Sequence, residues 1–437
     1  MSDIIQPRVL KGFRDFLPEA EIERAAMMEK LAGAFRSYGF VPIDTPALEY
    51  AEILLGKAGG ETEKQVYRFK DAGDRDVAMR FDLTVPFARF MAEHVAELYL
   101  PFKRYHMAKV WRGENTQRGR YREFVQCDFD IVGVDNAAAD FEILSVIRSA
   151  MTALGAADST VRMNNRGVFN RFLSRLGVAE RSVEILRIVD KLAKIGPDET
   201  RSQLAELAGA TAADELMAFI RTDEAFVDTL ARIERLAGGP AEDSERLRQI
   251  YAMAEACGIA DKVVLDPSIT RGLDYYTGVV FETFLDDMPE LGSVCSGGRY
   301  NDLASLYTKQ RLPGVGASVG MDRFLAGLEA LGRQSRRGSY GRVLVMNMDE
   351  AAAGEYQAAA AALRRAGIAC EVFPERRKPA QQFTYAEKKG IPYALIRGED
   401  EKARGVWTLR ELSTRKNDDY AELSAVAAAL GHAATEA

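Results

Sequence analysis

The sequence predicts a multidomain protein in which an α+β core is followed by a smaller α/β domain. Three patterns support this prediction. Residues 104–133 form two strand-like segments joined by a polar loop, strand patterns disappear between residues 168 and 257, and apolar segments of strand and helix length alternate from residue 343 onward. The last pattern is typical of a small α/β domain with a largely parallel sheet.

The changes in pattern also indicate where the domains begin and end. A charged, Gly- and Ser-containing stretch near residue 335 is typical of a linker. We therefore expect a core over residues 1–331, a helical insertion domain within it over 168–258, a linker over 332–341 and a C-terminal domain over 342–437.

Composition narrows the class of protein. Apolar residues make up 47% and charged residues 28%, as in soluble globular proteins. The net charge of −7 means that any nucleic-acid site must be a local patch. Four cysteines and three histidines, widely spaced, make a disulfide framework and a structural metal site improbable. The few, scattered cysteines suggest a reducing, cytosolic setting, so we expect a cytoplasmic protein. The start of the chain does not resemble a signal peptide, and without an apolar run of about 18 residues we expect no membrane span.

The first third of the chain is expected to mix helices with short strands. Apolar spacing predicts a helix over residues 19–38 that ends at Gly39. Two prolines confine the extended segment 40–46 to the edge of a sheet or to an interface without a regular hydrogen-bonded ladder. Pro86 predicts the first position of a helix. Further elements are expected as strands at 65–69 and 77–81 and a helix at 134–154.

The strand pair at 104–133 carries the most informative side chains. Alternation on its second strand places two sets on opposite faces: Tyr121, Glu123, Val125, Cys127, Phe129 and Ile131 on one, and Arg122, Phe124, Gln126, Asp128 and Asp130 on the other. Arg112 and Glu114 share a face of the first strand. Residues 103–122 hold seven basic residues and one acidic residue, and then Asp128 and Asp130 follow. One end of this polar face suits a phosphate and the other a cation, although a solvated outer face is the simpler alternative.

Three segments resemble histidyl-tRNA synthetases, which are class II aminoacyl-tRNA synthetases: Arg112-Gly113-Glu114, Arg120-Tyr121-Arg122-Glu123-Phe124 and Thr270-Arg271-Gly272-Leu273-Asp274-Tyr275-Tyr276. The resemblance covers nearly the whole chain. The first helix with residues 39–46 resembles motif 1 of the class, residues 104–133 resemble motif 2, and residues 314–323 resemble motif 3. Residues 271–276 and 296–300 resemble segments specific to the histidine enzyme.

The resemblance implies a fold and an activity. The fold would be a class II antiparallel-sheet catalytic core with a helical insertion, followed by an α/β anticodon-binding domain. The activity would be a ligation in which ATP activates L-histidine to histidyl-adenylate, releasing pyrophosphate, before the histidyl group passes to tRNA(His). The family also implies ATP with Mg²⁺ and a homodimer joined through motif 1, and we expect no structural metal, no DNA and no membrane partner.

The resemblance assigns residues to ATP. Arg112 matches the motif 2 arginine that bridges the substrate carboxylate and the α-phosphate, for which a guanidinium fork is suited. Phe124 matches the residue that stacks on adenine, and Glu114 resembles the carboxylate beside it. Arg323 matches the motif 3 arginine at the γ-phosphate, and Arg271 would be a second cation at the α-phosphate. Arg112 and Arg271 are thus the expected catalytic residues, and both would also touch histidine.

The amino-acid pocket requires acceptors as well. Asp82, Thr84 and Gln126 match the family's ligands for the α-ammonium group. Asp130 and Tyr276, with Tyr275 beside them, match its ligands for the imidazole. A buried carboxylate facing a ring N–H would reject apolar isosteres, because it would be left unpaired.

Simpler and rival interpretations stay open. Tyr275 and Tyr276 could be core aromatics, and residues 314–320 could form an ordinary turn, since they lack the lysine of a P-loop. Similar cores occur in a non-aminoacylating regulatory subunit of histidine biosynthesis, and a histidine- or tRNA-sensing binding module is a second rival. The presence of Arg112 and Arg271, and the long segment after residue 339, favour the synthetase.

Overall fold

The computed structural model describes residues 4–56, 61–116, 119–223, 225–269, 275–333 and 338–432. The chain forms two compact units, one of residues 1–14 and 27–333 and one of residues 15–26 and 334–437. Helix α1 (Pro18–Ser37) therefore contributes to both units. No helix among the described residues is long and apolar enough to cross a membrane. The limits of the core, insertion, linker and C-terminal domain stay predictions.

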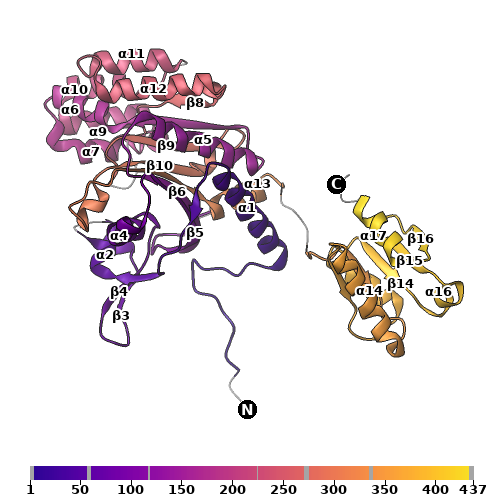
Figure 1. Cartoon of the computed structure of the whole chain (residues 1–437). Helices are drawn as coiled ribbons and strands as arrows, with labels where there is room; N and C mark the ends of the chain where they lie inside the picture. The colour runs from indigo at the N-terminus through magenta and orange to yellow at the C-terminus, as the bar shows by residue number, and fades with distance from the viewer. Residues whose placement is uncertain are drawn as a thin grey trace. The chain divides into compact units, whose positions relative to one another are not determined.

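The larger unit is built on an eight-stranded sheet (Figure 1). Its six inner strands pair antiparallel, and each edge strand pairs parallel with its neighbour. The order across the sheet is β1 (Val41–Pro42), β5 (Phe102–Trp111), β6 (Glu123–Val132), β11 (Gly314–Gly320), β10 (Cys295–Tyr300), β9 (Val279–Leu285), β7 (Ser159–Asn165) and β8 (Val263–Leu265). The expected antiparallel core and the edge position of residues 40–46 are confirmed.

The β5–β6 hairpin has the alternation that the sequence predicts. On the apolar face of β6, Phe129 packs against Phe35 of α1 with 4.8 Å between ring centroids. The polar face is not solvated, because Asp128 and Asp130 are each only 2% exposed. The simpler interpretation of this face as a solvent-exposed surface is therefore wrong. A sheet that buries carboxyl groups needs partners for them.

Helix α5 (Ala137–Ala153) covers part of the sheet through buried Ile143, Leu144 and Ile147. It begins at Asn136, whose side chain accepts a hydrogen bond from the Ala139 N–H. Before β5 lies a small antiparallel sheet in the order β2 (Leu48–Tyr50), β4 (Asp76–Met79) and β3 (Arg68–Lys70). In the chain, α2 (Ala51–Leu55) and α3 (Glu61–Gln65) lie between β2 and β3, and α4 (Thr84–His94) follows β4.

The expected position of Pro86 is wrong by two residues. Helix α4 begins at Thr84, so Pro86 is its third residue rather than its first. Proline is tolerated there because the first N–H groups of a helix have no partner within it. The Asp82 side chain accepts from the Val85 N–H and thereby starts the helix earlier than the proline indicates.

Between β7 and β8 the described residues form helices and no strand: α6 (Arg166–Arg175), α7 (Ser182–Val189), α8 (Leu192–Ile195), α9 (Pro197–Ala208), α10 (Ala210–Ile220), α11 (Phe226–Leu236) and α12 (Glu242–Ala256). In the core of these helices, the rings of Phe172 and Phe219 stack with 4.3 Å between their centroids. Arg246 of α12 donates to Asp140 of α5 at 2.6 Å, and Arg299 of β10 donates to the other oxygen of Asp140 at 2.8 Å. One carboxylate thus joins these helices to the sheet.

After β11, helix α13 (Met321–Ala330) completes the larger unit. Short 3₁₀ helices connect the elements of both units at η1 (Val95–Glu97), η2 (Ala179–Arg181), η3 (Ala260–Lys262), η4 (Pro289–Leu291), η5 (Leu303–Leu306) and η6 (Glu350–Ala352).

The smaller unit has a five-stranded sheet in the order β13 (Cys370–Val372), β12 (Val343–Val345), β14 (Tyr393–Ile396), β15 (Trp407–Glu411) and β16 (Asn417–Tyr420). The first three strands are parallel, as the β-α alternation predicts, and the last two are antiparallel. The prediction did not include β15 and β16, because β16 is polar and lacks an apolar run. The helices of the smaller unit are α14 (Ala353–Arg365), α15 (Pro379–Lys388), α16 (Glu399–Arg404) and α17 (Leu423–His432).

The tight contact between β10 and β11 generates a stability prediction. A Cβ at Gly297 would lie 2.2 Å from the Gly316 carbonyl oxygen and 2.5 Å from Ala317 Cβ, so backbone would have to move. We expect Gly297→Ala to destabilise the protein by about 1–3 kcal/mol or more in urea unfolding. Gly33→Ala is the matched control, because Gly33 lies in α1 with nothing within 4 Å, and alanine there should stabilise by up to about 1 kcal/mol. Equal stability of Gly297→Ala and the native protein would contradict the packing argument.

Candidate active site

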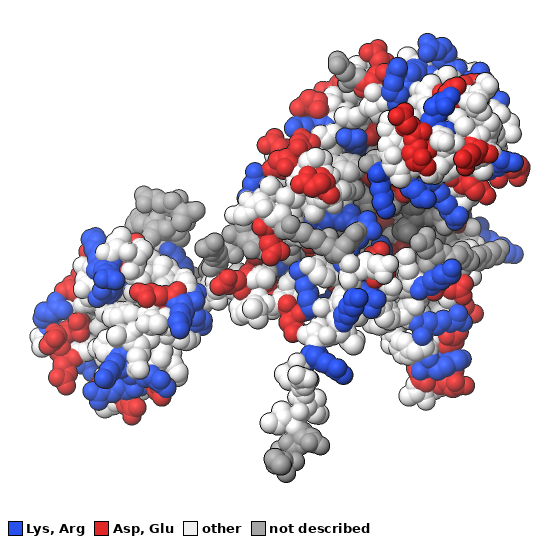
Figure 2. Space-filling view, turned by 180° about the vertical axis from the view of Figure 1, so that it is seen from behind, with Lys and Arg blue, Asp and Glu red and all other residues white. Residues whose placement is uncertain are grey.

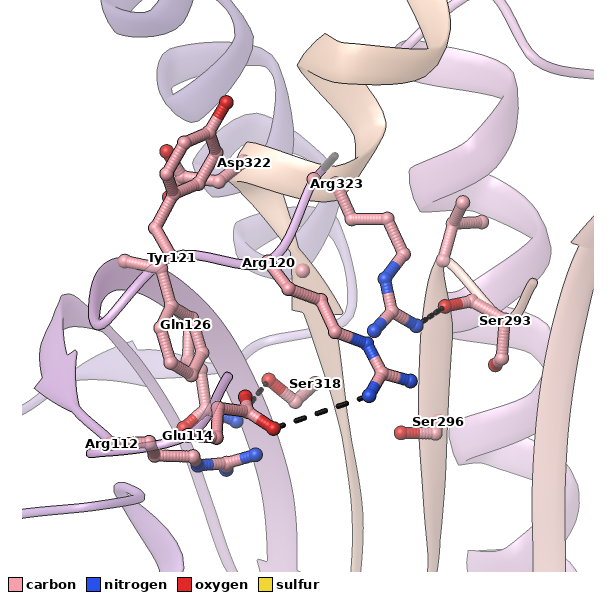
Figure 3. Close-up of a pocket in the computed structure, with 14 residues that line it drawn as sticks. Arg112, Glu114, Arg120, Tyr121, Gln126, Ser293, Ser296, Ser318, Asp322 and Arg323 are labelled. Carbon is pink, nitrogen blue, oxygen red and sulfur yellow. Dashed lines mark hydrogen bonds and ion pairs between the residues drawn. The ribbon is translucent and has the colours of Figure 1, made fainter. Parts of the chain in front are cut away.

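A cleft of about 1010 Å³ lies over the polar face of β6. Its lining comes from the β5–β6 hairpin, from β9, β10 and β11, from the start of α4, from the segment around η4, and from the helical segment around α7 and α8. A smaller pocket of about 120 Å³ adjoins it and shares several of its residues (Figure 3). In the larger unit, Figure 2 shows Lys and Arg side chains around the hollowed part of the surface, and Arg162 and Lys194 are among the cleft's lining.

One end of the cleft is cationic. Arg112 follows β5, and its Nε donates to the Phe81 carbonyl oxygen at 2.8 Å while its guanidinium carbon lies 5.1 Å from the Phe124 ring centroid. Arg323 of α13 donates from Nη1 to the Ser293 carbonyl oxygen at 2.6 Å. Arg120 extends into the same space as Arg323, with only a 4.0 Å ion pair to Glu114 (Figure 3). Three guanidinium groups meet here beside two carboxylates, those of Glu114 and Asp322, and this excess of positive charge favours an anionic ligand.

The segment before α1 fixes this end of the site. Arg14 donates to Asp322 at 2.6 Å and to the Tyr121 hydroxyl at 3.1 Å. The second oxygen of Asp322 accepts from the Val125 N–H at 2.8 Å. The Arg122 N–H donates to the Gly12 carbonyl oxygen at 2.8 Å. Asp322 therefore joins the start of α13 to the start of β6, so Arg112 and Arg323 lie on connected supports.

The other end of the cleft carries three buried carboxyl groups. Asp82 precedes α4, and its Oδ1 accepts from the Val85 N–H at 3.0 Å, whereas the Tyr275 hydroxyl is 3.5 Å from its Oδ2. Asp130 Oδ1 accepts from the Tyr300 hydroxyl at 2.5 Å, and its Oδ2 pairs with Arg104 Nη2 at 2.8 Å.

The third carboxyl group belongs to Asp128, which lies between Gln126 and Asp130 on the same face of β6. The neighbouring strand β11 passes close to this face. A Cβ at Gly316 would lie 2.0 Å from Asp130 Oδ1, so only glycine lets the strand pass the carboxyl group.

Burial changes the protonation of these groups. It raises the pKa of Asp82 to about 6, although Arg112 opposes the shift. It raises the pKa of Asp128 to about 7 against the opposing charge of Arg104, and the neighbouring carboxylates add to the rise. The pKa of Asp130 is raised for the same reason. Since each group is costly to ionise when the cleft is empty, a cationic ligand at this end would be stabilised by all three.

The structure brings together most of the residues expected from the sequence. Those that line the cleft are Asp82, Thr84, Arg112, Glu114, Gln126, Asp130, Tyr275, Tyr276 and Arg323. Phe124 lines the smaller pocket. Arg271 lies outside the described residues. Tyr275 and Tyr276 also pack against a buried apolar cluster, so they contribute to the core as well as to the cleft.

Several lining residues were not among the expected site residues: Arg120, Asp128, Ser293, Tyr300 and Ser318. Asp128 could have been found, because alternation places it on the polar face beside Gln126 and Asp130. Arg120 lies within the basic stretch that suggested a phosphate site. Ser293 contributes through its backbone oxygen, for which no side-chain pattern exists.

Comparison with known proteins agrees with this geometry. The family model described as Histidyl-tRNA synthetase matches residues 12–324, and the model described as Anticodon binding domain matches residues 342–430. The histidine–tRNA ligase of Treponema denticola is 57% identical over 406 residues, which cover 92% of this chain and 91% of that protein. The ligase of Treponema pallidum is 50% identical over 428 residues, covering 95% and 96%.

A solved structure has the same fold. The crystal structure of histidyl-tRNA synthetase from Nostoc sp. PCC 7120 superposes with a TM-score of 0.89 at 30% identity, covering 98% of this chain and all of that one.

The raised pKa values predict how stability depends on pH. Asp128 holds its proton to a higher pH when folded than when unfolded, so the folded state binds more protons between about pH 4 and 7 and loses stability as the pH rises through this range. We expect Asp128→Asn to be more stable than the native protein in ligand-free thermal melts at pH 8, by a few kcal/mol at most, with a smaller difference at pH 5. Asp74→Asn, at an exposed turn, is the control and should show no such dependence. A stability gain for Asp128→Asn that is the same at both pH values would refute the assignment.

Proposed function

This chain belongs to the histidyl-tRNA synthetase family, and on that premise we propose how its cleft carries out the family's reaction. The protein is a ligase that activates L-histidine with ATP to histidyl-adenylate and pyrophosphate and then transfers the histidyl group to tRNA(His). The observation that supports the location of the chemistry is a single cleft with guanidinium groups at one end and buried carboxyl groups at the other.

The first step joins two anions. A carboxylate oxygen of histidine attacks the α-phosphorus of ATP, and the bond from phosphorus to the bridging oxygen breaks as pyrophosphate leaves. No general base is needed, because the carboxylate is already ionised. Fixed cations must instead offset the repulsion and the charge that develops in the transition state.

We assign that task to Arg112, whose Nε is anchored on the Phe81 carbonyl oxygen, so its terminal nitrogens can serve the histidine carboxylate and the α-phosphate. Arg271 is proposed as the second cation there. Arg323 is assigned to the γ-phosphate, supported by its place in the lining of the smaller pocket. Phe124 and Glu114 are assigned to adenine.

The end of the cleft that carries the buried carboxyl groups is assigned to the amino acid. Asp82, Thr84 and Gln126 would bind the α-ammonium group. Asp130, Tyr275 and Tyr276 would define the imidazole subsite. The pairing of Asp130 with Arg104 and Tyr300 supports this, because a locked side chain can impose an orientation on the ring.

Three further assignments complete the proposal. ATP would arrive as its Mg²⁺ complex, since the two carboxylates that line the smaller pocket, Glu114 and Asp322, are each already paired with an arginine. A homodimer would form through α1 and residues 39–46. The smaller unit would bind the anticodon of tRNA(His), and the cytoplasm is the proposed location because all three substrates occur there.

The regulatory-subunit alternative is not favoured. The relatives named as histidine–tRNA ligases match more than nine-tenths of this chain, including its C-terminal part. Arg112, which a regulatory protein would not need, remains in the cleft.

Amino-acid-dependent exchange of pyrophosphate into ATP tests the proposal. We expect exchange with L-histidine and with no other standard amino acid, because the carboxyl groups of the cleft match both nitrogen-bearing groups of histidine. The measurement needs no tRNA, so it isolates the first step. Exchange with another amino acid at a comparable rate, or none with histidine, would overturn the proposal.

Arg112 is tested by substitution. We expect Arg112→Ala to lower kcat for histidine-dependent exchange by a factor of about 10² to 10³, as for other preorganised donors, with a smaller change in KM. Arg112→Lys should recover only part of the rate, because an ammonium cannot reproduce the fork. Arg187→Ala, on the exposed face of α7, is the matched control. Near-native kcat in a folded Arg112→Ala protein would show that the residue is structural.

A further inference from the structure

Asp128 is a buried carboxyl group of the cleft without an assigned role. It is 2% exposed, and its Oδ1 is fully buried with no hydrogen-bond partner among the described residues. Gln126 Oε1, two residues earlier on the same face, is also buried without such a partner. The amide nitrogen of Gln126 donates to Ser318 Oγ at 3.1 Å, which fixes the orientation of its oxygen. Two acceptors therefore lie unsatisfied beside each other in the cleft.

The two other carboxyl groups are better satisfied. Asp130 Oδ1 accepts from the Tyr300 hydroxyl, and its Oδ2 lies 2.8 Å from Arg104 Nη2 in an ion pair that lacks hydrogen-bond geometry. Asp82 uses Oδ1 for the start of α4, and only the Tyr275 hydroxyl at 3.5 Å faces its Oδ2. The acceptors left for a donor of the substrate are thus Asp128 Oδ1 and Gln126 Oε1, together with Asp82 Oδ2, whose contact with the Tyr275 hydroxyl is long. An ammonium group supplies three donors and the positive charge that buried carboxylates require.

The charges around Asp128 do not already meet this need. Arg104 and His106 face it from β5, and Ser318, opposite it on β11, offers its hydroxyl to the Asp128 side chain. Arg104 is paired with Asp130 and stacks on Phe87 at 4.0 Å, and burial lowers the pKa of His106 to about 4, so that ring is neutral. Arg80 also acts electrostatically on Asp128, but its guanidinium group donates to the carbonyl oxygens of Lys109 and Thr45. The remaining titratable neighbours are Asp82, Asp130, Tyr275, Tyr276 and Cys295, none of which brings positive charge.

We infer that Asp128 is the third ligand of the substrate's α-ammonium group, together with Asp82 and Gln126. This inference rests on the proposed function and adds a specificity-determining residue to it. The ammonium group is the better partner than the imidazole, because it carries a permanent charge at neutral pH, whereas the ring is largely neutral. Asp128 thereby selects amino acids over their deaminated analogues.

The test compares L-histidine with 3-(imidazol-4-yl)propionate, which lacks only the α-ammonium group. The KM for histidine and the inhibition constant of the analogue are measured in pyrophosphate exchange for the native enzyme and Asp128→Asn. We expect KM for histidine to rise about 10- to 100-fold, as for loss of a charge-assisted hydrogen bond, with kcat little changed. The inhibition constant of the analogue should stay the same or fall. An equal loss for both compounds, or an unchanged KM, would overturn the inference.

Asp140→Asn is the matched control, since Asp140 is a fully buried aspartate that does not line the cleft. It should lower the melting temperature, because Arg246 and Arg299 lose their shared partner. The ratio of the KM for histidine to the inhibition constant of the analogue should stay unchanged. A shift in that ratio as large as for Asp128→Asn would show that the ratio reports packing and would refute the inference.

A second measurement uses only the native enzyme. Calorimetric titration at pH 7 in buffers of different ionisation enthalpy counts the protons released on binding. Histidine should release protons, because its ammonium group stabilises the charged forms of Asp128, Asp82 and Asp130, whereas the analogue should not. Equal release by both would refute the inference. A native enzyme without histidine-dependent exchange would instead refute the proposed function.

Discussion

The buried ion pair between Arg104 and Asp130 fixes a carboxyl group that lines the cleft. Arg104 is fully buried and Asp130 is 2% exposed, and they lie opposite each other on the paired strands β5 and β6. Such a pair contributes little to stability relative to apolar residues of the same size, yet breaking it costs about 3–5 kcal/mol. The ion pair matters here for the charge of the cleft, because Arg104 neutralises Asp130 and leaves the other carboxyl groups for a ligand.

The strands beside this pair are shaped by the same constraint. A sheet with polar groups buried on one face can admit a ligand only where the neighbouring strands carry small side chains. Gly316 lets β11 pass Asp130, and Gly297 lets β10 approach β11. The segments 296–300 and 314–320 are therefore rich in glycine because two backbones and a carboxyl group share one space, which explains their composition without a phosphate-binding turn.

Much of the fold and the site follows from local pattern. Alternation along β6 separates its apolar face from the face with Gln126 and Asp130, and helix-length amphipathic segments distinguish residues 168–257. The partners of these residues do not follow, because pairing between distant segments leaves no local trace. In the sequence, nothing distinguishes Arg104 from other charged strand residues, because its pairing with Asp130 is seen only in the folded protein. Strand β16 and the true start of α4 were missed for a similar reason. A polar edge strand is a weaker signal than an apolar run, and an aspartate that accepts from an N–H of the first helical turn is a weaker signal than a proline.

The carboxylate of Asp140 has a consequence for how the larger unit moves. Each of its oxygens receives a different guanidinium group, from α12 on one side and from β10 on the other. Moving α12 away from α5 would take Arg246 from the fully buried Asp140 carboxylate and leave that charge with Arg299 as its remaining guanidinium partner. The contacts of Asp140 therefore oppose separate movement of α12 and the sheet.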